Sequence, residues 1–101
     1  MENYENYGTW DKSSKTFTFK EEIRTVDNKV AKEVPKDVEN LVGSGVETIG
    51  IGAFEDRKNL KTVNFQNATT IGGGAFGGCK NLKTADFPKV TTIGRGLLRN
   101  V

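Results

Sequence analysis

Two consecutive stretches of the chain repeat the same pattern of residues. Residues 46–67 and 68–89 match at an offset of 22 positions, and a third copy begins at Val90. The positions shared by the two full copies are Thr48/Thr70, Ile49/Ile71, Gly50/Gly72, Gly52/Gly74, Ala53/Ala75, Phe54/Phe76, Lys58/Lys80, Asn59/Asn81, Leu60/Leu82, Lys61/Lys83, Thr62/Thr84 and Phe65/Phe87. A unit of this length cannot bury its own apolar residues and must stack on a neighbouring unit. The sequence therefore predicts a solenoid.

Each full repeat contains a short stretch in which apolar and polar residues alternate. In Leu60-x-x-Val63-x-Phe65 the last two apolar residues lie two positions apart, and the copy that starts at Leu82 keeps this spacing. The spacing is typical of a half-buried strand, so Val63 and Phe65 should point inward. Equivalent strands of successive repeats should lie side by side in a parallel sheet. One column that this stacking predicts consists of Ile49, Ile71 and Ile93.

The first 33 residues do not follow the pattern of the repeats. Residues 1–13 are polar with scattered aromatic side chains, which predicts an arm that is either loosely ordered or laid over an apolar surface. Residues 15–20 alternate between Thr and Phe, and we expect residues 23–26 to return antiparallel to them as a hairpin. This hairpin would cap the first repeat and hide its open backbone edge.

The segment after the expected hairpin permits two interpretations. Asp27 and Asn28 form a turn signal, and the chain beyond them suits either a third short strand through Val30 or a single helical turn. We favour the strand. Pro35 should end either element, because proline has no amide hydrogen and disfavours helical backbone at Val34.

Residues 34–45 resemble a degraded repeat. One period before Leu60 and Val63 stand Val38 and Leu41, both apolar, whereas Gly43 stands one period before Phe65. Terminal repeats commonly depart from the consensus in this way. The predicted organisation is an N-terminal arm and β-hairpin cap at 1–33 and a solenoid at 34–101, comprising a degenerate rung 34–45, rungs 46–67 and 68–89, and a partial rung 90–101.

Composition argues against several classes of function. The chain has 101 residues, no histidine, one cysteine and a formal net charge of +2. Without histidine there is no obvious partner to activate Cys79, and no spaced carboxylates suggest a metal site, so we predict no enzyme, no cofactor and no bound metal. The small net charge predicts no nucleic-acid partner, and no apolar run is long enough for membrane insertion.

Two sets of outward-facing residues are candidates for binding. The first set, small and polar, should form columns on the exposed sheet face and suits a protein partner; it consists of Asn40, Thr62, Asn64, Gln66, Thr84 and Asp86. The second set is a lysine stripe for an anionic ligand such as an acidic glycan, with help from Arg57, Lys89 and Arg95; it consists of Lys58, Lys61, Lys80 and Lys83. Both sets also suit a surface that is merely well solvated.

The second full repeat carries a distinctive motif. It consists of Ile71-Gly72, Ala75-Phe76, Cys79, Leu82, Ala85 and Phe87-Pro88. Over residues 46–98 the pattern resembles the BspA-like (Treponema-type) leucine-rich-repeat family. The resemblance implies a mainly β, right-handed solenoid of the α/β solenoid class, found in bacterial cell-surface or secreted proteins that adhere to host proteins or other cells. Arg57 departs from the motif, because the pattern has cysteine there.

The resemblance also suggests a function. It implies a non-catalytic protein-recognition or adhesion module of a bacterial cell-surface or secreted protein, with a host or other-cell surface protein as partner. The alternative is a structural capping fragment of a longer repeat array with no binding activity of its own. Residues 1–16 lack the basic start and apolar run of a secretory signal, so the expected localisation follows from the resemblance alone.

The end of the sequence predicts an apolar surface. Ile93, Leu97 and Leu98 should pack on the preceding rung and have nothing on their other side. An uncovered apolar rung can drive association. We therefore expect either a longer repeat array or self-association through this end.

Overall fold

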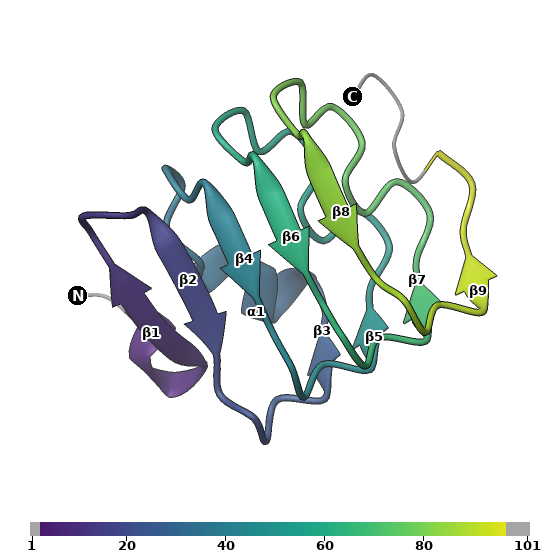
Figure 1. The fold of residues 1–101 in the computed structure, drawn as a ribbon, viewed down its shortest axis with the longest axis horizontal. Helices are drawn as coiled ribbons and strands as arrows, with labels where there is room; N and C mark the ends of the chain where they lie inside the picture. The colour runs from purple at the N-terminus through teal and green to yellow at the C-terminus, as the bar shows by residue number, and fades with distance from the viewer. Residues whose placement is uncertain (1–2, 97–101) are drawn as a thin grey trace.

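The repeated strands lie side by side in two sheets (Figure 1), in a computed structural model that describes residues 3–96. The first sheet has five strands in the order β1-β2-β4-β6-β8, with bounds Gly8–Asp11, Thr16–Phe19, Asn40–Val42, Thr62–Asn64 and Thr84–Asp86. The second has four strands in the order β3-β5-β7-β9, with bounds Thr25–Val26, Thr48–Ile49, Thr70–Ile71 and Thr92–Ile93. The helical elements are the 3₁₀ helix η1, Tyr4–Asn6, and the α-helix α1, Asn28–Glu33.

The strands pair in the register that the repeat predicts. Val63 of β6 lies opposite Leu41 on one side and Ala85 on the other. Ile49 pairs with Ile71, which pairs with Ile93, so the isoleucine column is confirmed. Every strand pair is parallel except β1 with β2. The chain is therefore a mainly β solenoid with an antiparallel hairpin at its N-terminal end, as predicted.

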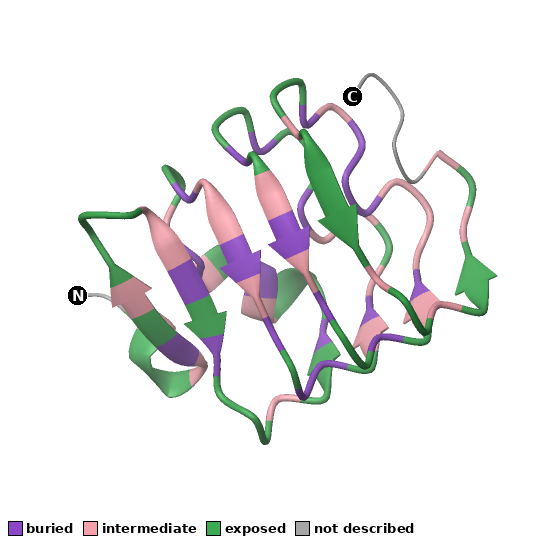
Figure 2. Cartoon of the chain, viewed as in Figure 1, coloured by how far each residue is buried: buried purple, intermediate pink, exposed green. Residues whose placement is uncertain are grey.

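The core lies between the two sheets and is built around stacked aromatic rings. Buried residues run through β2, β4 and β6 (purple in Figure 2), whereas β8 is exposed along its length. The Phe54 and Phe76 rings stack with centroids 5.7 Å apart, and Phe76 stacks on Phe87 at 5.9 Å. The large and small apolar residues of each repeat thus fill the space that the two sheets enclose.

The hairpin forms from different residues than we predicted. β2 pairs with Gly8–Asp11, which lies in the segment that we expected to be an arm, and not with residues 23–26. A glycine is required at the start of β1, because a Cβ atom on Gly8 would clash with the Thr18 carbonyl oxygen. The turn is fixed by Asp11, whose carboxylate accepts hydrogen bonds from the amide and hydroxyl of Ser13. Such an aspartate turn is a signal that our prediction overlooked.

The strand that we favoured after Asp27 does not form, and the alternative that we left open, a helical turn, is present there. Thr25–Val26 forms β3, but it pairs parallel with β5 in the second sheet. The chain then enters α1 and not a third hairpin strand. Asp27 acts as the N-cap, since its side chain accepts a hydrogen bond from the Val30 amide. The helix ends before Pro35 with Val34 in extended backbone, as the proline predicts.

The degraded repeat at residues 34–45 is built into the ladder. Val38 and Leu41 are fully buried, as predicted. Gly43 has no side chain, and the Phe65 ring and the Val46 side chain fill the space that a Cβ atom would take there. The centroids of the Phe19 and Phe65 rings lie 6.3 Å apart. Both sheets continue across residue 33, because β2 pairs with β4 and β3 with β5. The division into cap and solenoid at this point stays a prediction.

Candidate functional site

The outer face of the first sheet carries the polar residues that we expected there. Asn40, Thr62 and Thr84 pair in register across β4, β6 and β8, and Asn64 lies opposite Asp86. In β4 and β6 the residue between the two outward positions is buried, so the polar side chains project away from the core. The solenoid thus brings together, on three adjacent strands, residues that are far apart in sequence.

Hydrogen bonds between rungs hold most of these side chains in place. The Thr62 hydroxyl donates to Oδ1 of Asn40 at 2.7 Å, and Nδ2 of Asn40 donates to the Ser14 carbonyl at 3.0 Å. The amide nitrogen of Gln66 donates to Oδ1 of Asn64 at 2.6 Å and to Oδ2 of Asp86 at 3.0 Å. The face therefore presents amide, hydroxyl and carboxylate groups in a fixed array. A partner could form hydrogen bonds with this face without the entropy cost of fixing its side chains first.

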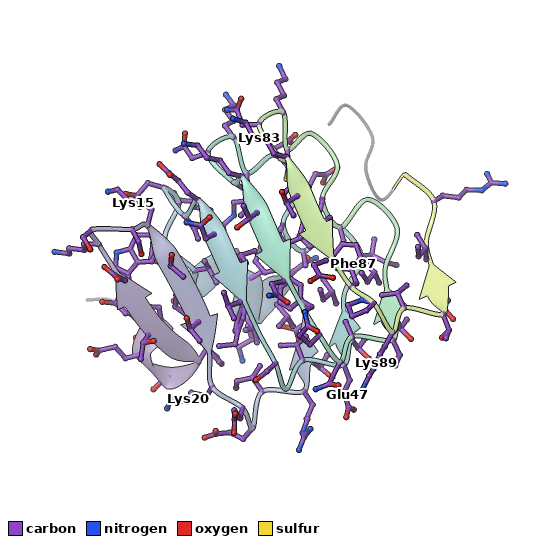
Figure 3. All side chains as sticks on the ribbon, viewed as in Figure 1. Lys15, Lys20, Glu47, Lys83, Phe87 and Lys89 are labelled. Carbon is purple, nitrogen blue, oxygen red and sulfur yellow. The ribbon has the colours of Figure 1, made fainter. Side chains whose placement is uncertain are left out.

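The four lysines of the predicted stripe are all exposed. Lys61 and Lys83 lie on adjacent rungs, since the Lys83 amide donates to the Lys61 carbonyl at 2.8 Å. The turns that carry Lys58 and Lys80 are also neighbours, because Nδ2 of Asn81 donates to the Lys58 carbonyl at 2.6 Å. Figure 3 shows Lys83 beside the start of its strand, at the same end of the first sheet as Lys15.

Acidic residues neutralise part of this end of the sheet. Nζ of Lys61 lies 3.3 Å from Oε1 of Glu39, one rung earlier, and Lys15 pairs with Asp37 at 2.9 Å. The hydrogen bond to Asp37 raises the pKa of Lys15, and the same bond lowers the pKa of Asp37. Within residues 3–96 no ion pair involves the other three stripe lysines, Lys58, Lys80 and Lys83. The unpaired charges of the stripe are thus Lys58 on rung 46–67 and Lys80 and Lys83 on rung 68–89.

Arg57 does not belong to the stripe, which corrects our expectation. Its side chain is buried and donates to the carbonyl oxygens of Ala31 at 2.6 Å, Val34 at 3.1 Å and Pro35 at 2.9 Å. These carbonyls close the C-terminal end of α1, where a cation is favourable. The guanidinium also lies 5.8 Å from the centre of the Phe54 ring. Burial lowers the pKa of Arg57, although the group stays charged at any ordinary pH.

The other two proposed helpers of the stripe lie apart from it. Lys89 follows β8 and sits at the opposite end of that strand from Lys83 (Figure 3), where its Nζ donates to Oδ1 of Asn67 at 2.8 Å. Arg95 follows β9, and its carbonyl accepts a hydrogen bond from the Gly74 amide. The stripe therefore consists of the four lysines alone.

Cys79 is buried in the core, as expected for a residue that fills space. Its thiol donates to the Phe54 carbonyl at 3.1 Å, and burial raises the pKa of the thiol. A protonated buried thiol is a poor nucleophile. Among the described residues no group of three His, Cys, Asp or Glu side chains could hold a metal ion. In the same part of the chain no helix is long and apolar enough to cross a membrane.

Sequence reasoning missed one exposed apolar residue. Ile51 is 75% exposed, and the equivalent positions of the next repeats are Gly73 and Arg95. An apolar residue where sister repeats have glycine or arginine is a signal that the core does not require it. This difference between repeats could have identified Ile51 before the structure was seen.

The last described rung exposes an apolar side chain. Ile93 is 57% exposed although it pairs with Ile71, and all three residues of β8 are exposed. Phe87 is half-buried and packs against the core. The predicted contacts of Leu97 and Leu98 lie outside the described residues.

Comparison with known proteins identifies the repeat. A family model for the BspA type leucine rich repeat region matches residues 9–101 in six copies. The match begins in β1, so it includes the hairpin as well as the regular repeats. The search of curated proteins and the search of solved structures both gave no match. With nearly its whole length matched, and with the stacked parallel strands that such repeats require, the chain belongs to the BspA-type leucine-rich-repeat family.

Proposed function

We propose that this chain is a non-catalytic recognition module that binds a protein partner through the outer face of its first sheet. The observation that carries the proposal is the set of polar side chains on β4, β6 and β8, several of which are held by hydrogen bonds within and between rungs. Solenoids commonly bind through such repeated surfaces. Membership of the BspA-type family supports a role in adhesion at a bacterial cell surface or in a secreted protein.

The test uses two substitutions in the centre of the face. Asn64→Arg and Thr84→Arg together place two long cations among small polar groups, which should block a partner by size and charge. The matched control is Thr25→Arg with Thr92→Arg, which adds the same charge at exposed threonines of the second sheet. Binding is measured on an array of secreted and cell-surface proteins, with circular dichroism to verify folding.

The proposal predicts that the Asn64→Arg, Thr84→Arg variant no longer binds proteins that the unmodified chain binds, whereas the control variant still binds them. Equal binding by the two double variants would rule out the outer face as the binding site. Absence of any signal from the unmodified chain would favour the alternative function, a structural cap of a longer array that does not bind by itself.

The lysine stripe supports a second ligand class, an acidic glycan. Three of its four lysines have no ion-pair partner within residues 3–96 and stand on adjacent rungs. If the stripe binds polyanions, the chain should be retained on a heparin column at low salt and released as salt screens the charges. Replacing Lys58, Lys80 and Lys83 by glutamine should abolish retention. Retention that survives this change would exclude the stripe as the site.

A further inference from the structure

A groove lies between α1 and the turn that follows β5. One wall consists of Asn28 and Lys32 from α1 and Lys36 just beyond it, and the other of Ile51, Gly52, Ala53 and Glu55, with Arg57 also in the lining. The groove has a volume of about 530 Å³ and is open to solvent. In Figure 1 α1 lies behind the first sheet.

Ile51 gives the groove an apolar anchor that the fold does not use. The side chain is 75% exposed, whereas Ile49, two positions earlier, is fully buried. The sister repeats have Gly73 and Arg95 at the equivalent position, and in all three repeats the next residue is a glycine with positive φ. A large apolar side chain exposed beside a groove is the usual anchor of a protein interface.

The charges of the groove are predominantly positive. Lys32 and Lys36 are exposed, and neither forms an ion pair among the described residues. Arg57 adds a third positive charge that no carboxylate compensates, because its hydrogen-bond partners are the neutral carbonyls of Ala31, Val34 and Pro35. Glu55 is the one acidic residue in the lining. Ligands with negative charge are therefore favoured.

We infer that this groove binds an acidic segment of a protein partner, which packs one apolar side chain on Ile51 while its carboxylates approach Lys32 and Lys36. Three of the five guanidinium N–H groups of Arg57 are used by the carbonyls that it contacts, and the charge of the group adds to the attraction. The apolar anchor supplies the contact area, and the cations select acidic over basic segments. This surface is independent of the outer sheet face.

The experiment is a titration of the ¹⁵N-labelled full chain with a peptide in which one leucine is flanked on both sides by glutamates. We expect amide shifts at Ile51, Gly52, Lys32 and Lys36, and weaker binding as salt is added. Two control peptides replace the leucine by alanine or the glutamates by lysines, and both should bind more weakly. Shifts confined to the first sheet, or binding of the lysine peptide equal to that of the acidic one, would overturn the proposal.

Variants of the chain distinguish binding in the groove from a general attraction between the acidic peptide and the positive charges of the protein. Ile51→Ser should lower the affinity for the acidic peptide about tenfold, because it removes the apolar anchor and leaves the buried core unchanged. Lys32→Glu with Lys36→Glu should abolish binding, whereas the charge-matched control Lys12→Glu with Lys20→Glu, at exposed sites elsewhere, should leave most of it. Unchanged affinity in Ile51→Ser, with a native amide spectrum, would refute the role of this residue.

Discussion

Arg57 and Cys79 occupy the same position of successive repeats and perform a similar task. The Cys79 thiol donates to the Phe54 carbonyl, and the Arg57 guanidinium donates to three carbonyls at the end of α1. The segment before the degenerate rung contains α1 where the later rungs have a turn, so a longer donor is needed to reach the carbonyls at the end of the helix. The arginine is thus an adaptation of the repeat to the cap that precedes it.

Replacing this arginine should be costly. Arg57→Ala leaves three carbonyls of the α1 end without their donor and opens space beside Phe54, and we expect a loss of about 2–4 kcal/mol in the free energy of unfolding. The measurement is urea denaturation followed by circular dichroism. Arg24→Ala serves as the control, because Arg24 is exposed and its ion pair with Glu47 spans 3.5 Å, so the change should stay within about 0.5 kcal/mol. Similar losses in the two variants would contradict the role given to Arg57.

The burial of Cys79 makes a prediction about thiol chemistry. Because burial raises the pKa of this thiol, it should stay protonated at neutral pH and react slowly with a disulfide reagent in the folded chain. Unfolding in urea should expose it and accelerate labelling by orders of magnitude. Labelling of the native chain at the rate of the urea-unfolded chain would show that the rung around Cys79 is not closed.

At the scale of elements, the packing between β2, β4 and β6 depends on Gly43, which has no side chain. A Cβ atom on Gly43 would lie 2.8 Å from Cγ2 of Val46 and 3.0 Å from the Phe65 ring. Gly43→Ala should therefore overpack the site and cost about 1–3 kcal/mol. The neighbouring exposed Ser44→Ala provides a control that should change stability by less than about 0.5 kcal/mol. Both are measured by thermal and urea unfolding.

A double variant tests the cause of that loss. Phe65→Leu removes ring atoms that the new methyl group would meet, so Gly43→Ala should cost less in the Phe65→Leu background than alone. Strict additivity of the two changes would mean that the cost of Gly43→Ala comes from something other than contact with the ring.

The elements that sequence predicted well are those that the repeat specifies. The inward positions of Val63 and Phe65 and the isoleucine column follow from a pattern that recurs at a fixed offset, so each copy supports the interpretation of the others. The outward polar residues of β4, β6 and β8 follow from the same alternation. Their use in binding cannot be read from the pattern, because any solvated sheet face carries similar residues.

The N-terminal elements could not be predicted with the same success, because they occur once. β1 begins with glycine and ends with aspartate, residues that are unfavourable in strands, and it exists because it packs on β2. The residues after Asp27 suit a short strand as well as a helical turn, and the burial of Ala31 in the core favours the helix Asn28–Glu33. Arg57 looked like a surface charge because the helix that it contacts had not been predicted.

At the scale of the whole molecule, the exposed Ile93 predicts association between copies. Among residues 3–96, β8 and β9 are the last strands of their sheets, and Ile93 is 57% exposed. Unpaired strand edges beside apolar side chains favour pairing with another chain. We expect sedimentation velocity to show a dimer whose fraction rises with concentration, and Ile93→Lys to shift the chain towards monomer. A single monomeric species over a wide concentration range would contradict this prediction.

The central claim is that the repeats stack rung on rung in a fixed register. Backbone hydrogen bonds report it directly, because the Gly72 amide donates to the Ile49 carbonyl at 2.7 Å and the Gly94 amide to the Ile71 carbonyl at 2.8 Å. The decisive measurement is an NMR experiment that detects scalar coupling across hydrogen bonds. The account predicts couplings from Gly72 to Ile49 and from Gly94 to Ile71. Couplings from these two amides to carbonyls of any other residue would contradict it.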